Sequence, residues 1–113
     1  MKLGIVAPCY NEHEVLAESA GRLTVLMDDL VAKKKIDADS FILFVNDGSK
    51  DASPAILDRL AMESEKVKVI HFSRNYGHEA AMIAGIDYST GDGVICMDAD
   101  LQHPVECIPQ ILD

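Results

Sequence analysis

The sequence predicts an α/β domain in which helices cover both faces of a mainly parallel β-sheet. Short apolar runs rich in Val, Ile and Phe alternate along the chain with longer segments whose apolar residues recur at helical spacing. Alternation of this kind gives parallel strands joined by right-handed crossovers. We therefore expect a three-layer α/β/α, Rossmann-like arrangement, formed by a single domain over residues 1–113.

Four strands are expected where β-branched and aromatic residues cluster, at residues 3–7, 41–45, 67–72 and 93–97. Helices are expected between them, because apolar residues there recur three or four positions apart. In chain order these apolar residues are Val15, Leu16, Leu23, Leu26, Met27 and Leu30, then Ile56, Leu57, Leu60 and Ala61, then Ala81, Ile83, Ala84 and Tyr88.

Capping residues mark the expected helix termini. Asn11 is predicted to be the N-cap of the first helix, and Ser53, which a proline follows, that of the second. His103 also precedes a proline, which predicts that a fourth helix begins there. The three lysines at 33–35 predict a solvated end of the first helix.

The charge balance excludes some classes of partner. The chain has 19 acidic and 10 basic residues, a formal net charge of -9, which argues against nucleic-acid binding. Its apolar runs are far shorter than the roughly twenty residues that a membrane-spanning helix needs, and the N-terminus has no pattern of a secretion signal. We expect a cytoplasmic domain without a membrane span.

Cysteine and histidine spacing does not indicate a zinc site or a disulfide framework. Cys9, Cys96 and Cys107 are odd in number and lack paired spacing, so we expect reduced core residues. The four histidines share no ligand spacing, and surface or cap positions are expected for them, with His103 closest to the acidic pair described next.

Polar residues follow three of the expected strands. They are residues 8–12 (Pro-Cys-Tyr-Asn-Glu), 46–49 (Asn-Asp-Gly-Ser) and 98–100 (Asp-Ala-Asp). The carboxyl ends of parallel strands border one crevice, so these segments are expected to converge. Taken singly, each has an ordinary explanation as a turn, a cap or a chance pair. Together they predict a ligand site, and the carboxylates of Asp98 and Asp100 invite a divalent cation.

The loop after the first strand excludes a common use of this architecture. It has no glycine, whereas a dinucleotide-binding fold places G-x-G-x-x-G there, and the P-loop lysine motif is also missing. A bound nucleotide would need its diphosphate neutralised by other means. Mg²⁺ or Mn²⁺ on Asp98 and Asp100 fits this need, because both ions prefer oxygen ligands. Arg74, one of few basic residues near the crevice, is either a phosphate ligand or an ordinary surface arginine.

Four segments together resemble inverting glycosyltransferase family two, most closely its dolichol- and undecaprenyl-phosphate sugar transferase branch. The segments are residues 8–12 (Pro-Cys-Tyr-Asn-Glu), 46–51 (Asn-Asp-Gly-Ser-Lys-Asp), 73–81 (Ser-Arg-Asn-Tyr-Gly-His-Glu-Ala-Ala) and 97–104 (Met-Asp-Ala-Asp-Leu-Gln-His-Pro). The family has a GT-A fold whose N-terminal half binds the nucleotide-sugar donor. The resemblance implies that Pro8, Tyr10 and Glu12 line the nucleotide pocket, that Asp47 faces the base and that Arg74 lies near the donor.

The resemblance also implies a metal site on the donor diphosphate. Asp98 and Asp100 would hold the metal, Asp98 would also contact the nucleotide sugar, and Gln102 would be a further metal ligand. One departure is that the family's usual Asp-Asp pair before Gly-Ser is here Asn46-Asp47. We expect donor binding to survive this change, with an altered nucleotide preference.

The expected reaction is sugar transfer, with inversion, from a UDP- or GDP-linked donor. A polyprenyl phosphate acceptor is already ionised near neutral pH, and no general base is identified in the chain. In the family, the acceptor side lies downstream. Residues 1–113 are therefore expected to be a nucleotide-sugar-binding domain truncated at its C-terminal side, from a parent at the cytoplasmic face of a membrane. The sugar is not predicted.

Two other functions compete with this interpretation. A non-catalytic nucleotide-sugar-binding module would carry the same residues. A phosphatase or phosphotransferase with an aspartate nucleophile is disfavoured, because its Asp-x-Asp pair follows the first strand, whereas here the pair follows the fourth. A strand that lacks its neighbour would present an unpaired edge, so we also expect self-association.

Overall fold

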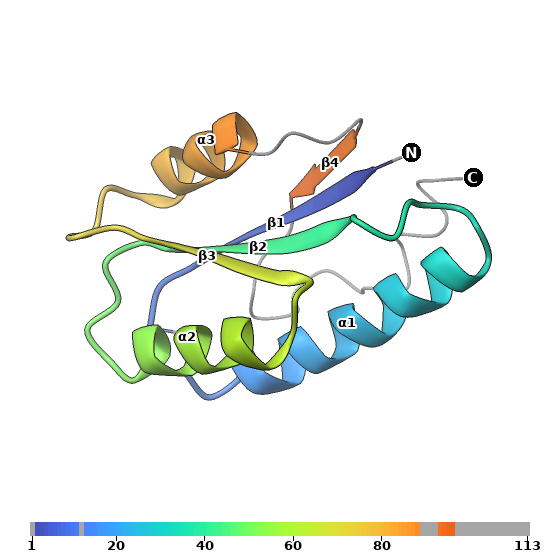
Figure 1. Ribbon diagram of the computed structural model, residues 1–113. Coiled ribbons are helices and arrows are strands. Elements are labelled where there is room, and N and C mark those ends of the chain that lie inside the picture. Colours follow the sequence, from blue (N-terminus) through green and yellow to red (C-terminus); the bar gives the residue numbers. More distant parts are fainter. Residues whose placement is uncertain (1, 12, 89–92, 97–113) are drawn as a thin grey trace.

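The protein forms one parallel sheet with helices on both faces, as predicted from the sequence. The computed structural model describes residues 2–11, 13–88 and 93–96. Figure 1 shows α1 and α2 on one face of the sheet and α3 on the other. The elements in chain order are β1 (Leu3–Cys9), α1 (Leu16–Ala32), β2 (Phe41–Asn46), α2 (Ser53–Glu63), β3 (Val67–His71), α3 (His78–Tyr88) and β4 (Gly93–Cys96).

The strand order is β3-β2-β1-β4, and all three strand pairs are parallel. In the register, Cys9 of β1 lies opposite Asn46 of β2, which in turn lies opposite His71 of β3. The carboxyl ends of these three strands therefore finish level with one another. The loops that follow them start from the same edge of the sheet.

Alternation along β1 and β2 divides the core between the two faces of the sheet. The larger cluster lies against α1 and α2, and includes Ile5, Ala7, Leu23, Met27, Ile42, Phe44 and Leu57. The smaller lies against α3, and consists of Val6, Phe41, Leu43, Val45 and Ala81, with Ile70, Phe72 and Cys96 packed against it. The same alternation continues past the end of β2, so successive residues there turn toward opposite layers.

Helix α3 packs closely on the sheet through small residues. A Cβ atom on Gly85 would lie 2.3 Å from Cγ1 of Val6, so only glycine fits there without a shift. Ala81 is completely buried, whereas Ile83 and Tyr88, two of the residues that predict this helix, are 60% and 55% exposed. The helix therefore presents an apolar outer surface.

The predicted N-caps of α1 and α2 are wrong. Helix α1 begins at Leu16, with Val15 at the N-cap and no capping side chain. Asn11 has a φ of 53° and its Oδ1 accepts the Lys50 N–H at 2.8 Å, so a tertiary hydrogen bond takes the side chain that a cap would need. Helix α2 begins at Ser53, one residue earlier than predicted. The N–H of Ser53 donates to Oδ1 of Asp51 at 2.8 Å.

The C-terminal end of α1 is confirmed. The helix stops at Ala32, Lys33 is its C-cap, and Lys34 after it takes a positive φ of 60°. Lys33 is exposed and forms an ion pair of 3.0 Å with Asp29 one turn earlier. The predicted helix start at His103 lies outside the described residues.

Two of the three cysteines, Cys9 and Cys96, lie in described strands. Cys9 is buried and its thiol donates to the carbonyl of Val45 at 3.6 Å, while Cys96 is half-buried. Burial raises the pKa of the Cys96 thiol. Cys107 lies outside the described residues. Over the described part of the chain, no helix combines the length and the apolar character that crossing a membrane requires.

Candidate functional site

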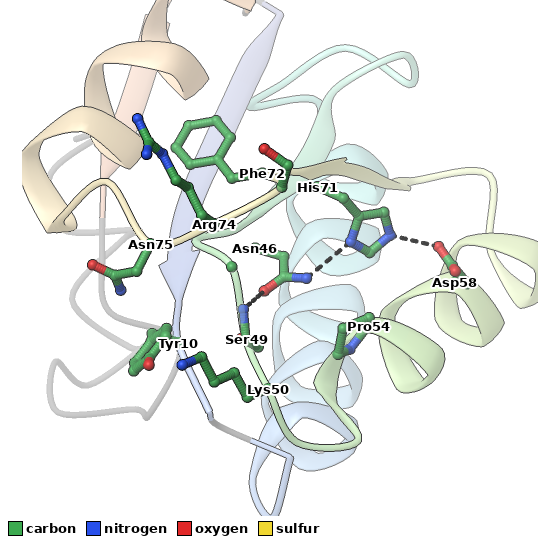
Figure 2. A pocket seen from close by; sticks show the side chains of 12 residues that line it. Tyr10, Asn46, Ser49, Lys50, Pro54, Asp58, His71, Phe72, Arg74 and Asn75 are labelled. Atoms are coloured by element: carbon green, nitrogen blue, oxygen red, sulfur yellow. Dashed lines mark hydrogen bonds and ion pairs between the residues drawn. The ribbon is translucent and has the colours of Figure 1, made fainter.

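A cavity of about 470 Å³ opens at the carboxyl ends of β2 and β3, next to the loop that follows β1 (Figure 2). This is the edge of a parallel sheet where ligands bind. The lining combines polar and aromatic side chains from all three loops and from α2. It includes Tyr10, Asn46, Ser49, Lys50, Asp58, His71, Phe72, Arg74 and Asn75.

Asp47 connects the end of β2 to the start of α3. Its side chain faces the α3 layer and is buried, with the residue only 3% exposed. One carboxylate oxygen accepts the Tyr76 N–H at 2.7 Å and the other accepts the Gly77 N–H at 3.0 Å. The Asp47 carbonyl accepts a further hydrogen bond of 3.3 Å from the Asn75 side-chain amide. The two charge-assisted hydrogen bonds of the carboxylate, together with this one, hold the β3–α3 loop against β2.

Gly48 allows the two loops to touch. It has a φ of +71°, and a Cβ atom there would lie 2.2 Å from the Arg74 carbonyl carbon and 2.4 Å from the Asn75 nitrogen. No side chain fits in that space. The main chain of Arg74 can therefore lie directly against the turn that follows β2.

Arg74 is supported by neighbouring aromatic rings. Its guanidinium carbon lies 4.8 Å from the centroid of the Tyr76 ring, which itself packs edge-on against Phe72 at 5.5 Å between centroids. Arg74 and Lys50 are the basic side chains among the described residues that line the cavity. They provide the positive charge that an anionic ligand would meet there.

Asn46, His71 and Asp58 form a continuous hydrogen-bonded chain on the opposite wall of the cavity (Figure 2). Nδ2 of Asn46 lies 3.0 Å from Nδ1 of His71, and Nε2 of His71 lies 2.7 Å from Oδ1 of Asp58. The strand register explains the contact between the first two, because Asn46 and His71 face each other across β2 and β3. On the other side, Oδ1 of Asn46 accepts the Ser49 N–H at 2.9 Å.

The loops after β1 and β2 are joined by reciprocal hydrogen bonds. The Asn11 N–H donates to Oγ of Ser49 at 3.0 Å, and the Lys50 N–H donates to Oδ1 of Asn11 at 2.8 Å. These bonds fix the segment that carries Tyr10, whose side chain lines the cavity.

A second connection between the same loops is formed by His13 and Asp51. Nδ1 of His13 lies 2.6 Å from Oδ2 of Asp51, and the His13 N–H donates to that oxygen at 3.3 Å. Burial alone would raise the pKa of Asp51, but hydrogen bonds from Ser53 and His13 outweigh it and hold that pKa well below its ordinary range. The ionised carboxylate is therefore the form that links the loops.

The predicted site residues fall into three groups. Tyr10 and Arg74 line the cavity, and Asp47 is buried beneath it with its carboxylate on the β3–α3 loop. Pro8 is buried in β1 and, of the described residues, is not one that lines the cavity. The remaining predicted residues, Glu12, Asp98, Asp100 and Gln102, lie outside the described residues.

The position of Pro8 suits a residue without an N–H group. The Cys9 carbonyl accepts the Asp47 N–H at 2.9 Å, so odd-numbered residues of β1 bond toward β2 and even-numbered ones toward β4. Described pairing with β4 ends at Val6, opposite Cys96. Pro8 lies beyond that point, so its missing N–H costs no ladder hydrogen bond among the residues that the structure describes.

Sequence reasoning missed the Asn46–His71–Asp58 chain. The histidines share no ligand spacing, and the surface position expected for His71 is what the structure shows, with its side chain 36% exposed, but its two hydrogen-bond partners are not predicted. The signal that could have found it is its place as the last residue of β3, level with the other strand ends.

No group of three or more His, Cys, Asp or Glu side chains within the described ranges could hold a metal ion. The predicted metal ligands follow β4 in the sequence. Strand β4 pairs with β1, which lies between β2 and β4 in the sheet. Two carboxylates and an amide oxygen are the donor types that Mg²⁺ and Mn²⁺ prefer.

A family model described as glycosyl transferase family 2 matches residues 4–113. The chain belongs to glycosyltransferase family 2. It is 42% identical over 113 residues to an uncharacterized glycosyltransferase, YkcC, of Bacillus subtilis, covering 100% of this chain and 33% of that protein. It is 39% identical to a bactoprenol glucosyl transferase of Shigella phage SfX, covering 100% of this chain and 35% of the relative. The chain thus spans about a third of the length of these family members.

A solved structure confirms the fold of this family 2 chain. The mannosyltransferase PcManGT from Pyrobaculum calidifontis, in complex with GDP-Man and Mn²⁺, superimposes with a TM-score of 0.72 at 19% sequence identity. The match covers 94% of this chain and 29% of the mannosyltransferase. The predicted Rossmann-like α/β architecture is therefore that of a known glycosyltransferase.

Proposed function

We propose that this chain binds the nucleoside-diphosphate-sugar donor of an inverting glycosyltransferase that acts on a polyprenyl phosphate with the help of Mg²⁺ or Mn²⁺. The observation that carries the proposal is the cavity at the carboxyl ends of β2 and β3, in a chain that belongs to glycosyltransferase family 2. We propose donor binding for these 113 residues themselves. Sugar transfer is proposed for the whole protein, because the chain spans about a third of the length of its relatives.

The cavity has the chemistry that a nucleotide needs. Tyr10 provides an aromatic face, and Arg74 and Lys50 provide positive charge for phosphate oxygens in a protein of formal net charge -9. Asp47 holds the Arg74 loop in place through the hydrogen bonds to Tyr76 and Gly77. We propose that the base lies near Asp47, that Pro8 supports the strand beneath it, and that Glu12 contributes from the β1 loop.

Arg74 and Lys50 can offset the charge of the bound donor's diphosphate, but not the further negative charge that develops as its bond to the sugar breaks. Asp98, Asp100 and Gln102 supply oxygen donors after β4, and this donor set fits Mg²⁺ or Mn²⁺. A bound ion would stabilise the negative charge that develops on the leaving diphosphate. The mannosyltransferase with GDP-Man and Mn²⁺ supports this assignment by its common fold.

The name of the phage relative supports a polyprenyl acceptor, because it is a bactoprenol glucosyl transferase. A phosphate acceptor is already ionised at neutral pH, so it attacks the anomeric carbon without a strong general base. Such a lipid resides in a membrane, and the proposed site of action of the whole protein is therefore a membrane surface, on the cytoplasmic side.

Isothermal titration calorimetry with UDP and GDP, in the presence of Mn²⁺, tests donor binding. Arg74→Gln removes a charge next to the cavity and should weaken binding about tenfold, the effect of losing a charge-assisted hydrogen bond. Arg59→Gln is the matched control, because Arg59 lies on α2 with its side chain 64% exposed and paired only weakly with Glu63 at 3.9 Å. The absence of binding heat for both nucleotides, or an affinity that Arg74→Gln leaves unchanged, would count against the proposal.

A further inference from the structure

The hydrogen bonds around Asn46 determine which nitrogen of His71 carries a proton. The Ser49 N–H can only donate, so the Asn46 atom that faces it at 2.9 Å must be the carbonyl oxygen Oδ1. Nδ2 of Asn46 then points at Nδ1 of His71, 3.0 Å away, and that nitrogen must offer a lone pair. The ring proton therefore resides on Nε2 and is donated to Asp58 at 2.7 Å.

Protonation of His71 conflicts with this arrangement. A proton on Nδ1 would face the two N–H donors of the Asn46 amide group. Rotating the Asn46 amide by 180° would place its oxygen against the protonated Nδ1 of His71. The NH₂ group would then face the Ser49 N–H, which is also a donor. Asn46 is only 2% exposed, so water cannot easily repair the loss at its amide, whereas the His71 side chain is 36% exposed and its ring is open to water.

The conflict would reach the loops that line the cavity. Ser49 follows Asn46 in the turn, and its Oγ accepts the Asn11 N–H at 3.0 Å. Asn11 in turn accepts the Lys50 N–H at 2.8 Å. A disturbed Asn46–Ser49 hydrogen bond therefore affects the segments that present Tyr10 and Lys50 to the cavity.

We infer that His71 is a positioning residue for donor binding and that its neutral Nε2–H form, held by Asn46 and Asp58, is the competent one. This inference rests on the proposed function, since it requires a nucleotide in the cavity. A second proton on the ring would break the contact between Nδ1 and the Asn46 amide, so we expect donor affinity to fall on acidification.

The groups around His71 act on it in opposite directions. Asp58 of α2 contacts Nε2 and favours the imidazolium, whereas the Asn46 amide of β2 opposes a second proton at Nδ1. Lys50 and Arg74, from the two loops, line the same cavity and add positive charge that also opposes it. These contacts oppose one another at the His71 ring, and a substitution at position 46 changes their balance.

Asn46→Asp is that substitution. A carboxylate at position 46 accepts hydrogen bonds from both the Ser49 N–H and a protonated Nδ1 of His71, so the conflict disappears. His71→Gln tests the same point differently, because glutamine offers an acceptor that does not titrate in this range. Both variants should lose the acid-dependent part of the affinity change.

The experiment is calorimetric titration of the 113-residue chain with UDP and GDP and Mn²⁺ at pH 8 and pH 5.5. The nucleotide affinity of the wild type should fall between pH 8 and pH 5.5. This fall should be about five- to tenfold larger than that of Asn46→Asp or His71→Gln, which is the effect of one lost hydrogen bond. Titration of the nucleotide and of the metal ligands is common to all variants, so the comparison cancels it. Glu63→Gln, an exposed change on the same helix as Asp58, should keep the wild-type profile.

The outcomes separate the two proposals. Equal pH profiles for wild type and Asn46→Asp would overturn the role of His71 while leaving donor binding intact. No nucleotide binding at either pH would overturn the proposed function, and the positioning role with it. Nitrogen-15 NMR of the free chain at pH 8 gives a ligand-independent check: the Nε2–H tautomer is expected, and an Nδ1–H tautomer would refute the inference.

Discussion

Replacing Gly48 by alanine should separate two loops that now touch. The added Cβ would lie 2.2 Å from the Arg74 carbonyl carbon, whereas carbon atoms in contact lie about 3.5–4.0 Å apart. The atoms it meets belong to the main chain and cannot rotate away. The loop that carries Arg74 must therefore move by more than about 1 Å to accept the methyl group.

The expected cost combines two effects. Alanine at a φ of +71° costs about 1–2 kcal/mol, and forcing extra volume into a packed site costs typically about 1–3 kcal/mol. Gly48→Ala should therefore lower the free energy of unfolding by about 2–5 kcal/mol, measured by urea denaturation. Nucleotide affinity should fall as well, because Arg74 is displaced from the cavity.

Gly21→Ala is the matched control for this experiment. Gly21 lies inside α1, and a Cβ atom there would meet nothing within 4 Å. Alanine is the better helix former, so this variant should gain about 0.5–1 kcal/mol. A free energy of unfolding for Gly48→Ala within about 0.5 kcal/mol of the wild-type value would refute this prediction. So would a change in that free energy with the same sign for both substitutions.

Two further predictions concern the loop connection and the sheet edge. The lowered pKa of Asp51 means that its ionised form stabilises the native state above about pH 4, the ordinary range of aspartate, and that this stabilisation is lost as the pH falls below it. In urea titrations at pH 7, Asp51→Asn should therefore have a free energy of unfolding about 1 kcal/mol lower than wild type. This value is reduced to allow for the partial exposure of the site. The difference should shrink at pH 3, and an equal difference at both values would contradict the assignment. The edge of β4, which among the described strands pairs only with β1, should make the chain self-associate. Sedimentation velocity should show species larger than a monomer at high concentration, and a strictly monomeric profile would refute this.

The sheet and its helices could be predicted because each element carries its own apolar pattern. Phe41 to Val45 is a continuous apolar run, and this is how a strand buried on both faces reads in sequence. The start of α1 could not be predicted, since Asn11 makes its hydrogen bonds with residues 38 and 39 positions away. A cap signal in sequence does not show that a more distant partner competes for the same side chain.

The cavity lies where the sequence predicts polar residues to converge, but the hydrogen bonds within it could not be predicted. Tyr10 and Arg74 were expected from the residues that follow strands, and both line the cavity. His71 was missed because its partners lie 25 residues away on β2 and 13 residues away on α2. Asn46 and Asp47 are adjacent in sequence, yet strand alternation sends one side chain toward α2 and the other toward α3.

We propose that a nucleoside diphosphate binds to this chain through a divalent cation, with Asp98 and Asp100 among the metal ligands. Calorimetric titration of UDP and GDP with and without Mn²⁺, on wild type and Asp100→Ala, tests it most directly. We expect one nucleotide to bind wild type at least about tenfold more tightly with the ion than without it, the effect of the 1–3 kcal/mol typical of coupling between two ligands. Asp100→Ala should lose that gain, and nucleotide binding that is independent of the metal and unchanged by the substitution would exclude metal-mediated binding.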